Sequence, residues 1–206
     1  MALVPVAEAL ERLLDGAAAL PGESVPLADA AGRVLAESVV ALRTQPPFEA
    51  SAMDGYAVRS ADVASAPARL SVIGVAPAGR GFTGSVGDGE AVRIFTGAPL
   101  PEGADTVVIQ ENVRAPGGGD IEVMEPTAQG RNVRRRGLDF GQGDMLLESG
   151  RLLDPAALSL AASANHPNLD VVRQPLVAII ATGDELLPPG SELGPDQIIS
   201  SNAYGV

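Results

Sequence analysis

The sequence has no cysteine and few aromatic residues, which make up 3% of its 206 residues. Without cysteine the protein forms no disulfide bond, uses no thiolate nucleophile and has no zinc site with cysteine ligands, and its redox compartment stays open. The scarcity of aromatic residues means that a hydrophobic core has to be packed from Val, Leu, Ile and Ala.

Positive charge is also scarce, because 14 Lys and Arg residues stand against 26 Asp and Glu residues, a formal net charge of −12. A field of that sign repels phosphate backbones and anionic membranes. Nucleic-acid binding is therefore the weakest of the functions considered, and we set it aside. An anionic ligand would have to be captured locally, by backbone amides or a small arginine cluster.

Long apolar runs are absent as well. None approaches the roughly 20 residues of a membrane span. The N-terminus has no basic segment followed by a long apolar stretch, so no signal peptide is expected. We expect a cytoplasmic protein that does not contact a membrane.

Three segments have helical patterns. Apolar residues recur at helical spacing over residues 5–20 and predict an amphipathic helix that ends at Pro21. "SVPLADAAGRVLAESVVA" predicts a short strand followed by a helix capped by Asp29. "DPAALSLAASAN" predicts a helix with Asp154 as its N-cap and Pro155 at its first position.

Between these segments the chain is rich in β-branched runs bounded by Gly and Pro. "ARLSVIGVAPAG", "EAVRIFTGAPL", "DTVVIQENV" and "DIEVME" predict strands, and "APGGGD" predicts a hairpin-like tip. Residues 45–130 are thus expected to form a compact β-rich domain. Since helices bracket it, the domain is interpreted as an insertion into a helical linker domain formed by residues 1–44 and 131–173.

The end of the sequence differs in kind. "PLVAIIATGDELLPPG" is typical of a buried parallel strand that opens an α/β domain. Such a domain needs on the order of 100 residues, so residues 174–206 are expected to be its first strand and incomplete start. The predicted fold class is α+β with several domains.

The stretch "PPFEASAMDGYAVR", residues 46–59, carries the first candidate site. Taken alone, Asp54-Gly55 is more typical of a turn. The alternative is a carboxylate held beside an anionic ligand, where it binds a metal ion or positions water. Mg²⁺ prefers a few carboxylates together with substrate phosphates, so a single positioned Asp54 is chemically sensible.

Two further stretches could bind an anion. Thr96 lies at the end of a predicted strand. It is either a polar residue at that strand end without a ligand, or it donates a hydrogen bond to an oxyanion or phosphate. "RNVRRRG" is a basic island in an acidic chain, and guanidinium groups match phosphate geometry. At least two of its four arginines are nevertheless expected on a solvated face: Arg131, Arg134, Arg135 and Arg136.

"TGDEL", residues 182–186, follows the last predicted strand. Ligands of open α/β sheets bind at the carboxyl ends of strands, so this turn is expected at a site. A capped turn with solvated carboxylates is an equally good interpretation. His166, the only histidine, is expected to be a solvated loop residue without a role.

Several long motifs occur together in one order: "PPFEASAMDGYAVR", "GEAVRIFTGAPLPEGADTVVIQE", "NVRRRGLDFGQGD", "VAIIATGDEL" and "IISSN". Through them the whole chain resembles the N-terminal part of MoeA-type molybdopterin molybdenumtransferases, the family of the gephyrin E domain. The resemblance implies an enzyme of molybdenum cofactor biosynthesis that inserts molybdate into adenylylated molybdopterin, with Mg²⁺, and releases AMP. It also implies a homodimer whose cleft lies between the β-rich domain of one subunit and the α/β domain of the other.

The resemblance carries site residues over by motif. It implies catalytic roles for Asp54, Thr96, Asp139 and Glu185, with Asp54 and Asp139 as metal ligands. These groups are expected to converge on one magnesium and phosphate pocket. The cofactor-binding residues expected beside them are Ser51, Arg93, Arg136, Thr182, Gly183, Asp184 and Asn202.

A second function remains open. The family's other molybdopterin-binding positions lie beyond residue 206, so this chain alone could be inactive. It would then be a truncated dimerisation or interaction module that binds a partner without catalysis.

Overall fold

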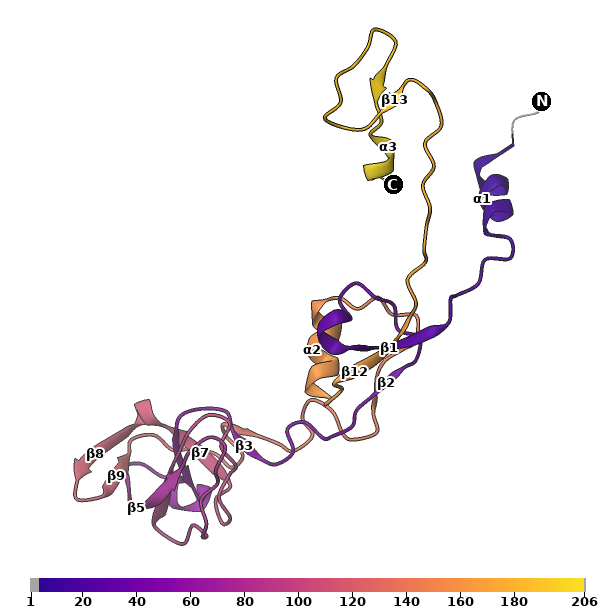
Figure 1. Ribbon diagram of the computed structural model, residues 1–206. Helices are drawn as coiled ribbons and strands as arrows, with labels where there is room; N and C mark the ends of the chain where they lie inside the picture. Colours follow the sequence, from indigo (N-terminus) through magenta and orange to yellow (C-terminus); the bar gives the residue numbers. More distant parts are fainter. Residues whose placement is uncertain (1–3, 206) are drawn as a thin grey trace. The chain divides into compact units, whose positions relative to one another are not determined.

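The computed structural model describes residues 4–205 and is mostly sheet with few helices (Figure 1). The chain divides into two compact units, one formed by residues 23–171 and the other by residues 1–22 and 172–206. None of the described helices is long and apolar enough to cross a membrane.

A six-stranded sheet dominates the larger unit, with strand order β7-β4-β6-β5-β9-β8. Neighbouring strands run antiparallel except β5 and β6, which are parallel. The four β-branched runs are confirmed as strands of this sheet, and every strand of the sheet lies within residues 45–130. The strands are β4 (Gly55–Val58), β5 (Ala68–Ala76), β6 (Glu90–Ile94), β7 (Thr106–Ile109), β8 (Val113–Gly117) and β9 (Asp120–Val123).

Small and β-branched side chains form the core of this sheet in two clusters. One is built around Val92, Ile94 and Val107, and the other around Val58, Leu70 and Ile121. All six are at most 2% exposed. Alternation along β4 and β6 sends neighbouring residues into different clusters, so the sheet is covered on both faces. The scarcity of aromatic residues is thus met by close packing of short side chains.

The predicted hairpin tip is confirmed between β8 and β9. Gly117, Gly118 and Gly119 have φ angles of 103°, 73° and 89°. Side-chain-bearing residues avoid this region of backbone space, so three consecutive glycines allow the reversal.

The other part of the larger unit contains α2 (Pro155–Ser163) and two small sheets. Asp154 is confirmed as the N-cap of α2, since its Oδ1 accepts a hydrogen bond of 2.8 Å from the Ala157 amide. Ala157 and Ala161 of α2 are buried in the core of this part. The paired strands are β1 (Gly22–Pro26) with β12 (Asn168–Val172) and β2 (Val39–Val40) with β11 (Met145–Leu147).

The predicted helix after Asp29 is wrong. The 3₁₀ turn η1 (Leu27–Asp29) ends at Asp29, and no helix follows it in residues 30–44. Gly32 follows with φ 72°, which interrupts any helix. The chain then runs extended, with hydrogen bonds of 2.9 Å from the Leu35 amide to Arg151 and from the Ala36 amide to Asp170. Backbone partners more than 100 residues away in the sequence therefore override a helical pattern of apolar residues.

The N-terminal helix is confirmed but shorter than predicted, as α1 (Val6–Leu14). It ends where Gly16 takes a φ of 78°. No residue of α1 is buried, and Val6 and Leu13 are 86% and 80% exposed. The amphipathic pattern thus leaves an apolar face in solvent.

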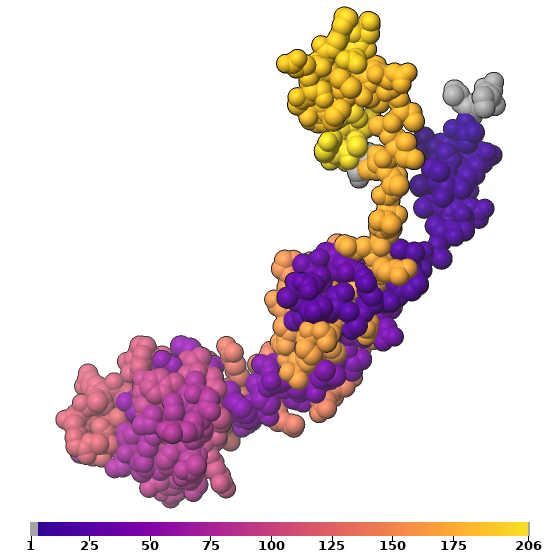
Figure 2. Space-filling view, in the orientation of Figure 1, coloured from indigo at the N-terminus to yellow at the C-terminus, as the bar shows by residue number. Residues whose placement is uncertain are grey.

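The strand predicted from "PLVAII" is also wrong. Residues 175–182 are extended but belong to no strand, and Leu176 and Ile180 are 102% and 81% exposed. In the space-filling view the first part of this segment is a narrow strip (Figure 2). A strand requires backbone partners on a neighbour, and none forms within residues 4–205. Strands do form further on, where β13 (Leu186–Leu187) pairs in parallel with β14 (Ile198–Ile199) before α3 (Asn202–Gly205).

This exposure predicts a proteolysis pattern. Thermolysin, which cuts before large apolar residues, is expected to cleave the 206-residue chain first within residues 176–180. A resistant core close to residues 23–171 should remain, because its apolar residues lie in strands and buried clusters. Mass spectrometry of a time course measures the products. Survival of the 176–180 segment after the core has been cut would contradict the prediction.

Candidate functional site

The stretch before Asp54 is a turn held from both sides. Its start is β3 (Ala50–Ser51), which pairs antiparallel with β10 (Val133–Arg134). The Ser51 amide donates to Ala98 at 3.0 Å, and the Ser51 carbonyl accepts from the Gly97 amide at 2.9 Å. The turn is therefore tied directly to the loop that follows β6.

The side chain of Ser51 is part of this framework. It is fully buried, and its hydroxyl donates to the Met53 carbonyl at 2.6 Å. The Asp54 carbonyl accepts from the Gln110 amide at 3.1 Å on the far side of the turn. These contacts fix the backbone on both sides of the Asp54 carboxylate and give Ser51 a supporting position.

Asp54 and Thr96 form the centre of the candidate site. Asp54 Oδ1 accepts two hydrogen bonds of 2.8 Å, from the amide and from the hydroxyl of Thr96. The hydrogen bond from the Thr96 amide, the hydrogen bond from its hydroxyl and the charge of Arg93 together lower the pKa of the Asp54 carboxyl below its usual 3.8. Within the described residues Oδ2 of Asp54 takes part in no hydrogen bond, so it stays open to solvent or a ligand.

Arg93 braces this pair from the neighbouring strand. Its guanidinium group donates to the Gly55 carbonyl at 3.0 Å and to Gln110 Oε1 at 2.6 Å. It also lies 5.0 Å from the ring centroids of both Tyr56 and Phe95. Arg93 thus holds the residues on either side of Asp54. Tyr56, Phe95 and Gln110 were not predicted from the sequence, because the register of β4 against β6 is what places Tyr56 opposite Arg93.

These contacts predict how Asp54 titrates. In the 206-residue chain, carboxyl ¹³C shifts should show Asp54 titrating below 3.8. The stability that this group contributes is present above that unfolded value and is lost as the pH falls through the lower folded value. Thr96→Val removes the hydroxyl donor but keeps the amide, so the pKa should rise part of the way. An unchanged pKa in Thr96→Val would contradict the role of the hydroxyl.

Asp139 and Arg136 lie on a separate turn. Arg136 Nε donates to the Pro47 carbonyl at 3.1 Å, and the Asp139 amide donates to Gln45 at 3.0 Å. The Asp139 side chain is exposed and, over residues 4–205, makes no hydrogen bond or ion pair. No polar contact links it to Asp54 or Thr96, so a shared pocket for the three remains a prediction.

The residues of "TGDEL" belong to the smaller unit. Thr182 and Asn202 line one cavity of about 370 Å³ together with Leu186 and Ile198. Gly183, Asp184 and Glu185 are exposed on the turn before β13. The structure thus brings Thr182 and Asn202, the first residue of α3, to one cavity.

The fit of a magnesium ion depends on few donors. No group of three or more His, Asp or Glu side chains that could hold a metal occurs among residues 4–205. Mg²⁺ commonly binds through one or two carboxylates plus water and substrate phosphates. The open Oδ2 of Asp54 fits that requirement as a single protein ligand.

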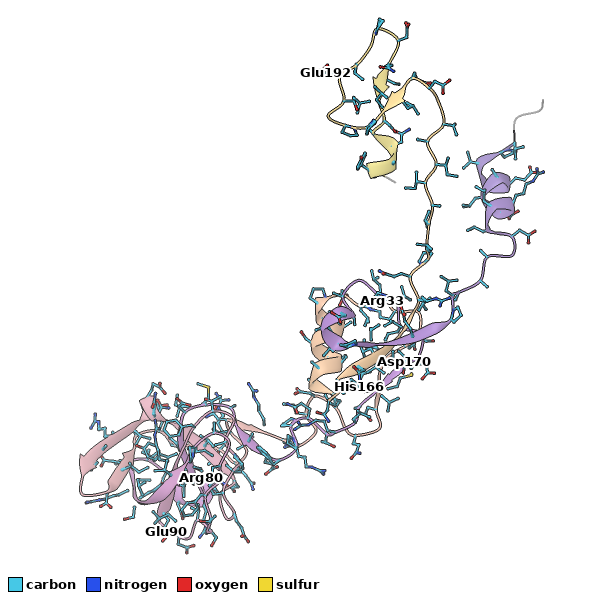
Figure 3. All side chains as sticks on the ribbon, in the orientation of Figure 1. Arg33, Arg80, Glu90, His166, Asp170 and Glu192 are labelled. Atoms are coloured by element: carbon cyan, nitrogen blue, oxygen red, sulfur yellow. The ribbon has the colours of Figure 1, made fainter. Side chains whose placement is uncertain are left out.

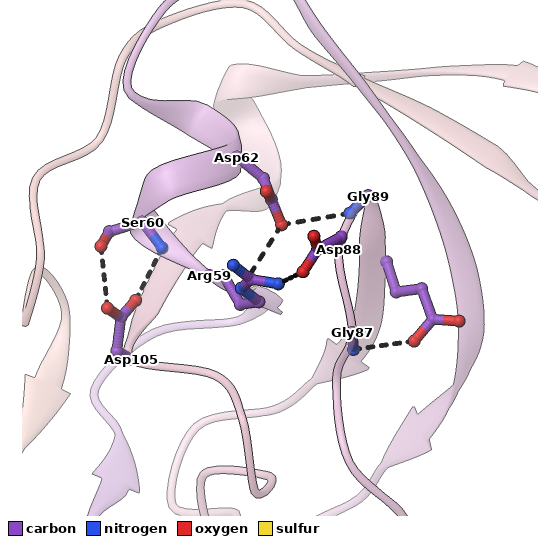
Figure 4. A network of polar contacts seen from close by, with 8 residues as sticks. Arg59, Ser60, Asp62, Gly87, Asp88, Gly89 and Asp105 are labelled. Carbon is purple, nitrogen blue, oxygen red and sulfur yellow. Dashed lines mark hydrogen bonds and ion pairs between the residues drawn. The ribbon is translucent and has the colours of Figure 1, made fainter.

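A polar network elsewhere in the unit has a structural role (Figure 4). Arg59 pairs with Asp88, and Asp62 accepts from the Gly89 amide at 3.1 Å. Asp105 accepts from the amide and hydroxyl of Ser60 at 2.7 and 2.8 Å. These contacts engage three carboxylates, one in η2 (Ser60–Val63) and two in neighbouring loops, and they hold the loops together.

His166 lies in a loop, as the sequence predicted, but it is only partly exposed and has a polar partner. Its Nε2 lies 2.7 Å from the carbonyl oxygen of Val40 in β2, within hydrogen-bonding distance (Figure 3). The ring therefore links the loop after α2 to a neighbouring strand.

Comparison with known proteins gives consistent results. Residues 4–165 match the family described as the MoeA N-terminal region (domain I and II). The molybdopterin molybdenumtransferase of Haemophilus influenzae is 40% identical over 184 residues, which cover 89% of this chain and 45% of that protein. The enzyme of the same name from Staphylococcus aureus strain N315 is 35% identical over 207 residues, covering 97% and 48%.

A solved structure has the same fold. The crystal structure of a molybdopterin biosynthesis moeA protein from Pyrococcus horikoshii OT3 matches with a TM-score of 0.87 and 37% sequence identity. The match covers 99% of this chain and 55% of that chain. The chain therefore spans about half the length of the relatives it matches.

Proposed function

The chain belongs to the MoeA N-terminal region family, and on this premise we propose that it acts in molybdenum cofactor biosynthesis. The proposed reaction is insertion of molybdate into adenylylated molybdopterin, with Mg²⁺ and release of AMP. The observation that supports it best is the Asp54–Thr96 pair. An ionised carboxylate is held there by two hydrogen bonds with one oxygen left open.

This chain's residues would contribute positioning and charge. Asp54 would hold a magnesium ion through Oδ2, and the ion would neutralise charge on the adenylate's phosphate groups. Thr96 directs its hydroxyl proton at Asp54 Oδ1, so its first role is to orient that carboxylate. Donation to an oxyanion of the substrate would require the hydroxyl to rotate. Arg93 and Ser51 would keep the turn rigid.

The remaining parts of the proposal concern residues at other places in the chain. We propose Asp139 as a second metal ligand and Glu185 as a further catalytic carboxylate. Arg136, Thr182, Gly183, Asp184 and Asn202 are proposed to bind the substrate. We further propose a homodimer in which the inserted β-rich domain of one subunit faces the α/β domain of the other, which would bring these groups to one cleft.

A second candidate is a non-catalytic interaction module. The exposed apolar face of α1 favours it, since Val6 and Leu13 lie almost wholly in solvent. Such a module would form a dimer or bind a partner through α1 and would show no affinity for molybdopterin.

An assay separates the two functions. The 206-residue chain and a chain of the relatives' full length are each incubated with adenylylated molybdopterin, molybdate and Mg²⁺, and AMP release is measured. Activity that requires the longer chain and Mg²⁺ supports the enzyme. Absence of activity and of molybdopterin binding in both chains would leave the interaction module.

A further inference from the structure

A cavity of about 500 Å³ lies in the larger unit beside the turn that carries Asp54. Three apolar side chains form part of its wall: Met53, Ile109 and Pro126. Met53 is 44% exposed, so a large apolar side chain faces open space there. Neither Asp54 nor Thr96 lines this cavity, which makes it distinct from the candidate site described above.

The polar side chains that line the cavity differ in whether they have a hydrogen-bond partner. Glu125 and Asn112 are linked by one hydrogen bond, since Asn112 Nδ2 donates to Glu125 Oε2 at 2.8 Å. The guanidinium group of Arg131 has no such partner. It is exposed and makes no hydrogen bond or ion pair to any residue from 4 to 205. The cavity therefore presents the positive charge of Arg131 without an ion-pair partner, and the Glu125 carboxylate, which keeps its own charge, lines the same cavity.

Arg131 belongs to the arginines that form no ion pair within residues 4–205, as do Arg134 and Arg135. Acidic residues outnumber basic ones by 26 to 14, and all 14 basic residues are arginines. Several of the arginines do find carboxylates, among them Arg59, Arg69 and Arg151. Arg131 lines the cavity together with Glu125 but forms no ion pair with it, so its guanidinium group is available for an external anion, and its planar fork suits carboxylate and phosphate oxygens.

The backbone around Arg131 is fixed in advance. Its carbonyl accepts from the Val107 amide at 3.0 Å and from the hydroxyl of Thr106, which is fully buried. Asn132 takes a φ of 58°, a conformation that asparagine tolerates better than most residues. Its Nδ2 donates to the Val107 carbonyl at 2.8 Å, and its own carbonyl accepts from the Ala52 amide. A ligand would thus find a preformed cavity with little ordering cost.

We propose that this cavity binds a small organic oxyanion, a phosphate monoester or a carboxylate with an apolar body. The anionic group pairs with Arg131, and the apolar body packs on Met53, Ile109 and Pro126. The lining combines these apolar side chains with polar ones in similar measure, and in small-molecule sites a few placed polar groups fix the orientation of a ligand. The proposal does not depend on the reaction proposed above.

Binding is tested by titrating the ¹⁵N-labelled 206-residue chain with phenyl phosphate, benzoate and inorganic phosphate. Amide shifts are expected at Met53, Thr127 and Asn132 with at least one of the two aromatic anions. Whether phenyl phosphate, benzoate or both bind identifies the oxyanion. Inorganic phosphate should bind more weakly than the better aromatic anion, because it has no apolar body to place against the wall.

Two variants test whether the guanidinium group of Arg131 binds the anion. Arg131→Met should weaken binding of the aromatic anion about tenfold or more, since a charge-assisted contact is lost. Arg134→Met is the matched control. It makes the same change of charge three residues away, at an exposed position that does not line the cavity, and should leave the affinity unchanged.

Three outcomes would overturn the proposal. The first is that neither aromatic anion causes localised amide shifts. The second is equal weakening by Arg131→Met and Arg134→Met, which would indicate unspecific attraction to the arginine-rich segment. The third is affinity for inorganic phosphate equal to that for the aromatic anions. An amide spectrum of Arg131→Met that matches the original chain establishes that the variant is folded.

Discussion

Asp54→Ala in a chain of the relatives' full length is expected to slow molybdenum cofactor formation about 100-fold or more, the usual cost of removing a group that stabilises charge at a reaction centre. The variant loses the open oxygen proposed to hold Mg²⁺ and the acceptor that orients Thr96. Folding should persist, because the turn is also held by the buried Ser51 hydroxyl and by backbone contacts to Gly97 and Gln110. The rate of AMP release and a thermal melt measure the two effects.

Two control variants make this result specific. Asp54→Asn keeps an oxygen that accepts from Thr96 but removes the charge, so it should be nearly as slow as Asp54→Ala if the charge matters. Asp120→Ala removes another carboxylate of the same sheet, one that accepts from Arg69 and Ser71, and should retain full activity. If Asp54→Ala unfolds while its folded fraction keeps full specific activity, Asp54 is only a turn residue.

The strands of the larger unit could be predicted from the sequence because their signal is local. β5 alternates over nine residues between exposed and more buried positions, and Gly-rich turns bound its neighbours. The helix expected after Asp29 and the strand expected at residues 175–182 failed for a different reason. In both, the outcome depends on whether backbone partners distant in the sequence are present, as they are for Leu35 and, among residues 4–205, are not for Leu176.

The candidate site shows the same limit. Asp54 and Thr96 could each be selected from the residues around them, but 42 positions separate them in the sequence, and spacing alone does not reveal that their side chains meet. The family resemblance identified both residues as site residues but did not predict the contact between their side chains. The brace formed by Arg93, Tyr56 and Phe95 depends on strand register, which an isolated sequence specifies only after the sheet order is known.

The structure also changes the interpretation of the glycine in "MDGY". Gly55 is the first residue of β4 and does not have a positive φ, so the turn conformation does not require it. A Cβ at this position would lie 2.0 Å from the Val108 carbonyl oxygen and 2.9 Å from the carbonyl carbon. Close approach of β7 therefore demands glycine here.

Gly55→Ala is accordingly expected to destabilise the larger unit by about 3 kcal/mol or more, at the upper end of the cost of overpacking. The obstacle is backbone in a paired strand, which cannot rotate away as a side chain could. For a unit of this size the melting temperature should fall on the order of 10 °C. Thermal unfolding of the 206-residue chain, followed by an amide signal from the buried Val107 of β7, gives the measurement.

Gly81→Ala is the matched control for Gly55→Ala. Its new Cβ would lie 3.7 Å from Pro99 in ordinary contact, and its φ is not positive, so its melting temperature should stay close to that of the original chain. Equal melting temperatures for the two variants would mean that β4 and β7 separate at little cost. The position of Asp54 would then be far less rigid than its contacts imply, because Asp54 and Gln110 extend from the ends of these two strands.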